Sequence, residues 1–364
     1  MQQSLKIKIS ISVLLFFIVS VFIIGAARDD GYGSYGPTPL EFKIPTGWPT
    51  PPSNIFTNNK LTEEGFRLGK KLFYDGRLSK NGEVSCASCH QQFAAFATFD
   101  HDLSHGVNNT LSTRNAPGLF NLAWKTNLHW DGGVNHIEVQ PLSPLTAPNE
   151  MGETLDSVLF KIKKDTAYKR MFKAAFGNAT INSQRMLKAL AQFTGTLLSA
   201  NSKYDKVKRG EAAFSSYEEK GYEVFKVKCA SCHKEPLFTD NSFRNNGLEL
   251  NRFNDIGRQK ITQLSSDSLK FRVPSLRNAQ LTFPYMHDGR IYSIPQVIEH
   301  YRTGIITEQP TLDSSLRKRI PLSNLEKSQL VYFIYTLTDS SFTKDVRYTP
   351  DGINSIINPG FDRH

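Results

Sequence analysis

The sequence predicts a mainly α-helical protein built from two similar halves. Residues 62–73 and 218–225 both show apolar side chains at helical spacing, with glutamates at the start, where the helix dipole favours negative charge. Thr62 is expected to cap the first of these helices. Each segment is followed by the same string, Cys-Ala-Ser-Cys-His, and then by two further shared patterns. A helix and three sequence patterns in one order indicate a duplicated unit.

The repeated string occupies residues 86–90 and 229–233 and contains all four cysteines of the chain. Cys-x-x-Cys-His is the attachment sequence of c-type haem: the thiols form thioethers with the porphyrin, and the histidine binds the iron. Structural zinc would need a fourth ligand, and a redox dithiol has no use for a fixed histidine. We therefore predict two cytochrome c-like domains, each carrying one covalently attached haem c. The predicted haem-binding residues are Cys86, Cys89, His90, Cys229, Cys232 and His233, with His90 and His233 as ligands of the iron.

The beginning of the chain predicts export. Two lysines precede an apolar run over residues 9–24, and residues 25–27 supply the small side chains of a cleavage site. The run is also long enough for an uncleaved span, so residues 1–27 are a signal peptide or an N-terminal anchor. Residues 28–58 are rich in Gly, Pro, Thr and Asn and are expected to form an extended lead-in. The expected location is the periplasm, either soluble or tethered to the membrane.

The remaining chain is long enough for two domains. Residues 155–176 and 183–198 show helical spacing and are expected to complete the first domain, and a polar, basic stretch over residues 200–210 marks the boundary. A helix over residues 324–337 is expected to end the second domain, and the chain beyond it to be irregular. The predicted domains are residues 59–203 and 204–345, followed by a tail over residues 346–364.

The formal net charge of +10 identifies no partner by itself. Haem propionates would offset part of it, and a basic surface suits an acidic redox protein. No nucleic-acid-binding motif is present, so no nucleic-acid partner is expected.

The repeat continues downstream of the haem motifs. Residues 117–121 and 274–278 share Pro-x-Leu-x-Asn, and Asp-Gly follows fourteen residues after each proline. This alignment pairs His129 with Met286. Because Met286 lies in the duplicated loop, we predict it as the sixth ligand of the second haem, with the adjacent His287 as the alternative. A thioether ligand raises the haem potential. The second haem is then a high-potential electron store.

The first half has no methionine at the matching place. A haem that activates peroxide needs an open sixth position and a group that moves a proton between the two peroxide oxygens. Glu150 can do this if burial keeps its pKa near the working pH. An ordinary surface carboxylate is the alternative at this position.

From about residue 60 to residue 340 the chain resembles bacterial dihaem cytochrome c peroxidases and the wider family that includes MauG. The resemblance rests on Asn81-Gly82, Ser85 to His90, Ser104-His105-Gly106, Arg114-Asn115-x-Pro117, Trp130-Asp131-Gly132, Gln140, Glu150-Met151, Phe271 to Asn278 and Pro284 to Gly289.

The resemblance implies that the first haem is peroxidatic and that the second accepts electrons from a donor. It implies Glu150 as the acid-base residue, Gln140 as a polar group of the distal pocket, and Trp130 as an electron path between the haems. It also implies a calcium ion between the domains, with Asn115 contributing and backbone carbonyls and waters supplying most other ligands.

In many relatives a histidine at the position of His105 blocks the first iron in the oxidised enzyme, until reduction of the second haem releases it. An exposed loop histidine is the other interpretation. His129 competes for this place, because the repeat sets it opposite Met286. His129 stands where relatives have an aromatic residue, and Gly133 stands where many have arginine.

We therefore predict a periplasmic cytochrome c peroxidase that reduces hydrogen peroxide to water with electrons from a small cytochrome c or cupredoxin. The alternatives are a MauG-like oxidase acting on a protein substrate, which Met286 disfavours because MauG carries tyrosine there, and a non-catalytic dihaem electron carrier or sensor. The sequence leaves open the donor, signal cleavage, homodimer formation and the need for reductive activation.

Overall fold

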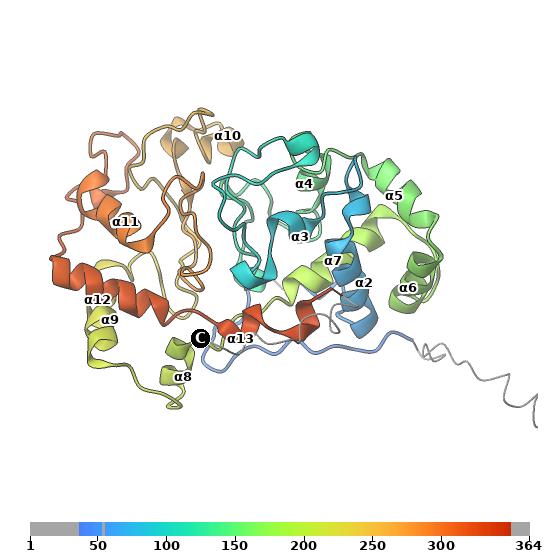
Figure 1. Ribbon diagram of the computed structural model, residues 1–364, viewed down its shortest axis with the longest axis horizontal. Coiled ribbons are helices and arrows are strands. Elements are labelled where there is room, and N and C mark those ends of the chain that lie inside the picture. The colour runs from blue at the N-terminus through green and yellow to red at the C-terminus, as the bar shows by residue number, and fades with distance from the viewer. Residues whose placement is uncertain (1–35, 53–54, 351–364) are drawn as a thin grey trace, which may run out of the picture. The chain divides into compact units, whose positions relative to one another are not determined.

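Helices carry most of the regular structure in the computed structural model, which describes residues 36–52 and 55–350 (Figure 1). The longer helices are α2 (Glu63–Tyr74), α3 (Cys86–Cys89), α4 (Leu142–Thr146), α5 (Leu155–Lys163), α6 (Thr166–Phe176), α7 (Ser183–Gly195), α8 (Lys203–Lys208), α9 (Ser216–Lys228), α10 (Gln259–Thr262), α11 (Ile294–Glu299), α12 (Asn324–Tyr335) and α13 (Ser340–Thr343). Single turns lie at Gly76–Leu78, Gln92–Ala94, Val107–Asn109, Leu122–Trp124, Ser265–Asp267, Ser314–Leu316 and Val346–Tyr348, and a wider turn at His300–Gly304. In the described residues the sheet consists of β1 (Phe243–Arg244) and β2 (Phe271–Arg272), which are antiparallel with Phe243 opposite Arg272. The prediction of a mainly helical fold is confirmed.

In the first half, α2 packs against α7. Thr62 caps α2 as expected, because its hydroxyl accepts a hydrogen bond from the Gly65 amide at 3.0 Å. Gly69 lies so close to the carbonyl of Ala189 on α7 that any side chain there would collide with it. The absence of a side chain therefore allows the two backbones to approach closely. The core around them is apolar, with Phe73 and Phe193 fully buried.

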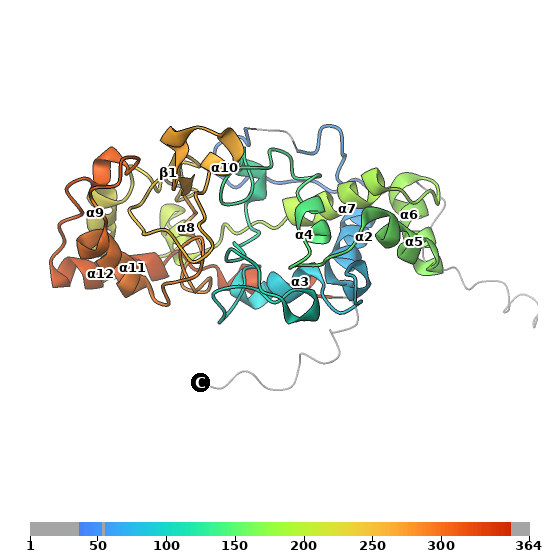
Figure 2. The same cartoon turned by 90° about the horizontal axis from the view of Figure 1, so that it is seen from above.

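The second half repeats this arrangement with α9 and α12. Gly221 on α9 lies against the carbonyl of Gln329 on α12, as Gly69 lies against Ala189. Phe225 and Phe333 are buried between the helices, with ring centroids 5.0 Å apart. In Figures 1 and 2, helices α9, α11 and α12 lie together on the left, and helices α2, α5, α6 and α7 lie together on the right.

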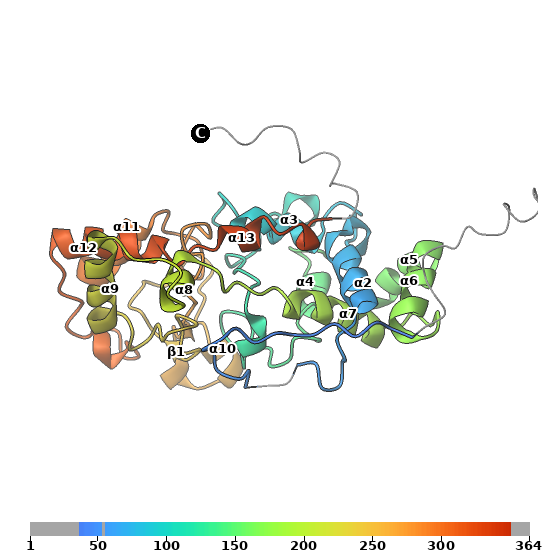
Figure 3. The same ribbon diagram turned by 90° about the horizontal axis from the view of Figure 1, so that it is seen from below.

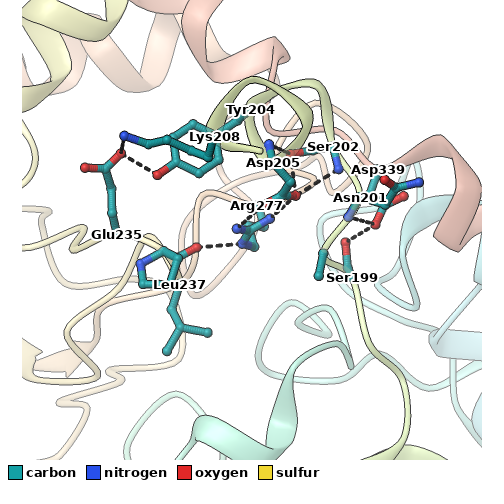
Figure 4. Close-up of polar contacts among 12 residues, drawn as sticks. Ser199, Asn201, Ser202, Tyr204, Asp205, Lys208, Glu235, Leu237, Arg277 and Asp339 are labelled. Atoms are coloured by element: carbon teal, nitrogen blue, oxygen red, sulfur yellow. Dashed lines mark hydrogen bonds and ion pairs between the residues drawn. The ribbon is translucent and has the colours of Figure 1, made fainter. Parts of the chain in front are cut away.

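The two halves meet at Ser199. The side chain of Asn121 donates to the Ser199 carbonyl at 3.0 Å, and that of Asn278 donates to the Ser199 hydroxyl at 2.9 Å. Beside this point Arg277, which is fully buried, pairs with Asp205 at 2.7 Å (Figure 4). Burial acts to raise the pKa of Asp205, but the hydrogen bonds and charge of Arg277 hold it below its usual value.

Several helix limits differ from those expected. Residues 155–176 form two helices, because Asp165 caps a new one through the Ala167 amide at 2.7 Å. The polar boundary stretch contains the short helix α8, which a capping box at Ser202 begins. The region after residue 337 is not wholly irregular, since it contains α13 and a helical turn at Val346–Tyr348. Helices α7 and α12 end two or three residues earlier than expected.

The described part of the lead-in has no helix, as expected. It runs along both halves (Figure 3): Thr38 bonds to Glu64 on α2, and the Trp48 ring lies 4.5 Å from the Arg277 guanidinium. The predicted signal or anchor over residues 1–27 lies outside the described residues. Within the described ranges, no helix combines the length and apolar character needed to cross a membrane.

Candidate functional site

The first haem motif opens onto a cavity between the helices of the first half. Cys86 and Cys89 lie on α3, which Ser85 begins with a capping box, and both line the cavity together with His90. None of the four cysteines, all of which lie within the described residues, forms a disulfide. Burial raises the pKa of Cys86 to about 12, so its thiol is neutral before reaction.

Both motif histidines are held by backbone carbonyls. His90 Nδ1 lies 2.8 Å from the Phe96 carbonyl oxygen, and His233 Nδ1 lies 3.1 Å from that of Phe238. A carbonyl only accepts, so Nδ1 carries the proton and Nε2 keeps the lone pair that binds a metal. Burial lowers the pKa of His90 to about 4 and also lowers that of His233, which favours the neutral, metal-binding form.

The second cavity contains Cys232, His233 and Met286 in its wall. The Met286 sulfur accepts a hydrogen bond from the side chain of Asn246 at 3.5 Å. His287 also reaches this cavity, but its ring stacks on Phe271 at a centroid distance of 3.7 Å. Because the His287 ring packs against Phe271, Met286 is the better candidate of the two for a haem ligand.

The loops that carry His129 and Met286 follow the same backbone path. Each is closed by one antiparallel bridge, between Leu128 and Val134 in the first half and between Tyr285 and Ile291 in the second. His129 and Met286 both have positive φ, +64° and +74°, and the glycines three residues later have φ +75° and +71°. The alignment of His129 with Met286 is therefore matched by backbone geometry.

Polar side chains gather on the wall of the first cavity. Glu150, Gln140 and His129 all line it, with His129 Nε2 3.4 Å from Gln140 Nε2. Burial raises the pKa of Glu150 and lowers that of His129, because both charged forms lose contact with water. A carboxyl whose pKa is raised takes up and releases its proton at a higher pH than an ordinary glutamate, as a proton-transferring group requires.

His105 lies elsewhere. Its neighbours Ser104 and Gly106 line the first cavity, whereas the His105 ring is exposed and its Nδ1 lies 2.5 Å from Asn109 Oδ1. The ring contacts His101 at a centroid distance of 5.2 Å. The His105 side chain is therefore not part of the first cavity wall that Glu150, Gln140 and His129 form.

Trp130 lies in the wall that separates the two cavities and borders both. Its indole N–H donates to the Asn115 carbonyl at 2.9 Å, and the Asn115 side chain donates to the Asp102 carbonyl at 3.1 Å. Asn115 also borders both cavities. Among the described residues no group of three His, Cys, Asp or Glu side chains could hold a metal, so a calcium ion at Asn115 would depend on backbone oxygens.

Ion pairs fix the loop that carries Trp130 to the second half. Arg114 bonds to Asp131 at 2.5 Å and to Asp255 at 2.6 Å. Burial opposes ionisation of Asp255, but Arg114 lowers its pKa to about 2. Beside Gly132, the Arg258 guanidinium donates to the Asp131 carbonyl at 3.2 Å. A guanidinium from the second half thus lies beside the loop.

A family model for di-haem cytochrome c peroxidase matches residues 63–213. The chain is 36% identical to the methylamine utilization protein MauG of Methylophilus methylotrophus over 304 aligned residues. The aligned region covers 82% of this chain and 88% of that protein. The chain belongs to the di-haem cytochrome c peroxidase family. The resemblance predicted from the sequence motifs is therefore confirmed, and the chain is an oxidoreductase of a family that carries haem c.

Two further members of this family extend the likeness. Cytochrome c551 peroxidase of Nitrosomonas europaea is 34% identical over 276 residues, or 74% of this chain and 79% of that protein. The crystal structure of a MauG-like protein associated with microbial copper homeostasis aligns with a TM-score of 0.77 at 32% identity, over 85% of this chain and 99% of that one.

The residues present fit haem c, the family cofactor, at both cavities. Each cavity has a cysteine of the motif in its wall beside a histidine whose Nε2 can bind iron. In the wall between them, the buried Nη1 of Arg272 has no hydrogen-bond partner among the described residues, and a haem carboxylate would supply one. The first haem would be held by Cys86, Cys89 and His90, and the second by Cys229, Cys232, His233 and Met286.

Three further residues lie at the cavities without having been predicted as site residues: Lys125, Arg272 and Asn246. Lys125 and Arg272 border both cavities, and Asn246 contacts the sulfur of Met286. Lys125 directly follows the apolar residues Leu122–Trp124, and this position in the sequence could have indicated a partly buried lysine. Arg272 lies within one of the motifs that carry the family resemblance, but the sequence does not indicate its contacts with Trp130 and His129.

Proposed function

We propose that this protein is an exported peroxidase that reduces hydrogen peroxide to water with electrons from a small cytochrome c or cupredoxin. The observation that carries the proposal is the difference between the two cavities. Glu150, Gln140 and His129 line the first, and Met286 lines the second. The first cavity is suited to proton transfer, and the second to holding an electron at high potential.

When bound, the first haem, which Cys86, Cys89 and His90 would hold, would supply the redox chemistry that breaks the O–O bond of peroxide. Glu150 accepts a proton from one peroxide oxygen and delivers it to the other, which leaves as water. Gln140 and His129 orient the peroxide by hydrogen bonds. Two electrons and two further protons complete the conversion of one peroxide to two waters.

Trp130 is proposed as the electron path between the haems. Its position in the wall shared by both cavities supports this role, and its hydrogen bond to Asn115 keeps the ring in one orientation. A calcium ion at Asn115 would add rigidity to the same wall, because the Asn115 carbonyl already holds Trp130.

His105 is proposed as the group that blocks the first haem in the oxidised protein. Its Nδ1 is bonded to Asn109, which leaves Nε2 as the ligating atom, and the residues on either side line the first cavity. His129 is already in the cavity wall, but Gln140 lies against its Nε2. A swing of the short loop around His105 would bring that ring to the iron.

The domain limits at residues 59–203 and 204–345, and export through residues 1–27, belong to the same proposal. The repeated helix pairs, α2 with α7 and α9 with α12, support one haem for each half. Covalent attachment of haem c in bacteria takes place after export, which supports a periplasmic location.

Steady-state turnover tests the function. The full chain, produced with both haems, should oxidise a reduced small cytochrome c in the presence of peroxide, with two donor molecules oxidised for each peroxide consumed. Donor oxidation without peroxide gives the baseline. Donor oxidation at the baseline rate would contradict the proposal and favour an electron carrier or sensor.

A second function has specific support, because relatives at 36% identity and a solved structure at 32% identity are named MauG or MauG-like. Such a protein would direct peroxide oxidation to a protein side chain. Peroxide consumption that continues with a donor present but without matching donor oxidation would favour this alternative.

A further inference from the structure

Two cations, the buried Arg272 and the half-buried Lys125, lie in the wall shared by the two cavities. Arg272 is only 3% exposed and borders both cavities, as does Lys125. The Arg272 amide donates to the Trp130 carbonyl at 2.7 Å, and its Nε donates to the His129 carbonyl at 3.3 Å. These bonds fix the backbone of Arg272 and its Nε and leave the end of its guanidinium at the cavity wall, where Nη1 has no partner among the described residues.

Neither cation has a carboxylate partner in the described part of the chain. The neighbouring arginines differ: Arg244 pairs with Asp240 and Asp313, both at 2.8 Å, and Arg114 pairs with Asp131 and Asp255. The cation pair therefore stands out among the charges that border the cavities. Two like charges in one dry region are unfavourable unless an anion joins them.

The pKa values agree with this geometry. Burial lowers the pKa of Lys125 well below its usual value, and the nearby charge of Arg272 lowers it further. Burial also lowers the pKa of Arg272 to about 10. A bound anion would reverse both effects, because it stabilises the charged forms.

We propose that Lys125 and Arg272 form a carboxylate-binding site for the haem propionates of both cavities, so that one cation pair is shared by the two haems. The guanidinium fork suits a carboxylate, and Lys125 adds a second charge from the other half of the chain. The shared site would couple the haems electrostatically and hold the wall that contains Trp130. This inference requires loading with two haems, which the family implies, and does not depend on peroxide turnover.

Reduction potentials of the loaded full-length protein test the site. Lys125→Met removes the charge, and Lys125 makes no hydrogen bond to the described protein that would be lost with it. A lost cation disfavours the reduced haem, so both midpoint potentials should fall. We expect at least a tenfold change in each reduction equilibrium, which is about 59 mV for a one-electron couple. Lys125→Arg should keep both potentials near the wild-type values.

Lys260→Met is the matched control, because Lys260 borders only the first cavity and is already paired with Asp255 at 3.3 Å. It should change neither potential by this amount. Arg272→Gln should lower both potentials, and both neutral variants should shift the propionate bending band in resonance Raman spectra. Potentials of Lys125→Met equal to those of Lys260→Met, or a change at one haem alone, would overturn the shared site. The absence of peroxidase activity in the wild type would leave this result intact.

Discussion

One loop geometry presents different side chains to the two cavities. The first half places His129 at a positive φ, with Gln140 and Glu150 nearby, and the second places Met286 in the same conformation. Among the described residues that line the second cavity there is no aspartate or glutamate. The duplicated backbone therefore presents a side chain to each cavity in the same way. Under the proposed function, a few substitutions decide whether protons or only electrons are handled there.

The same division appears in the packing. Phe120 in the first half aligns with Arg277 in the second, since each precedes the asparagine that bonds to Ser199. Phe120 is buried near Phe342, whereas Arg277 is buried against Asp205. Equivalent places are thus filled by an apolar ring in one half and by an ion pair in the other.

The largest expected effect is that of Glu150→Gln, which would leave Asp131, already paired with Arg114, as the carboxyl of the first cavity. Positioned acid-base groups contribute about 10² to 10⁴ in rate, so peroxide turnover should fall within that range. Glu150 works as a base only above its pKa, which burial raises. The acid limb of the wild-type pH profile should therefore lie above that of an ordinary glutamate and vanish in the variant. Glu138→Gln, outside both cavities, is the control, and near-normal turnover of Glu150→Gln would contradict the assignment.

Arg277→Met tests the packing difference. It should lower the free energy of unfolding by about 3–5 kcal/mol, because it leaves the buried carboxylate of Asp205 without the cation that neutralises it. The equivalent change in the first half, Phe120→Met, exchanges one apolar side chain for another and should cost less than about 1.5 kcal/mol. Denaturant unfolding of both loaded variants measures the difference. Equal costs would mean that the buried pair contributes no more than an apolar contact.

The local features of the fold were predictable from sequence, and the long-range ones were not. The cap at Thr62, the paired haem motifs and the alignment of His129 with Met286 depend on short patterns that occur twice. The wall between the cavities depends on Lys125 and Arg272, which are far apart in sequence and meet only through tertiary packing. The break at Asp165 was missed because apolar spacing continues across it, while one capping carboxylate decides the outcome.

Met286→Leu should remove the sulfur that is proposed to bind the second haem, while keeping about the same side-chain volume. The midpoint potential of that haem should fall, since the thioether favours ferrous iron, and the sulfur-to-iron absorption band should disappear. Met186→Leu, buried on α7, controls for the loss of a core methionine. If the band persists in Met286→Leu, His287 or another residue is the ligand, and the two loops are less alike in function than in backbone.

Paired substitutions of His105 and His129 sharpen the comparison further. His105→Ala should give a high-spin first haem in the oxidised protein, active without prior reduction, because its blocking ligand is gone. His129→Ala should remain low-spin and only slow the peroxide step. Electron paramagnetic resonance of the oxidised variants reads the spin state directly. If His129→Ala opens the iron instead, the first loop supplies a ligand just as the second does.

The smallest expected effect concerns Asn246, whose side chain donates to the Met286 sulfur and whose carbonyl accepts from His300 Nε2 at 2.9 Å. The hydrogen bond withdraws electron density from the thioether and so favours the reduced haem. A neutral hydrogen bond contributes about 0.5–1.5 kcal/mol, so Asn246→Leu should lower the potential of the second haem by less than Met286→Leu does. Thr282→Val, in the same cavity wall, should leave the potential unchanged. A shift at the first haem, or none at the second, would show that the amide does not tune the sulfur, and that Met286 alone sets the difference between the two halves.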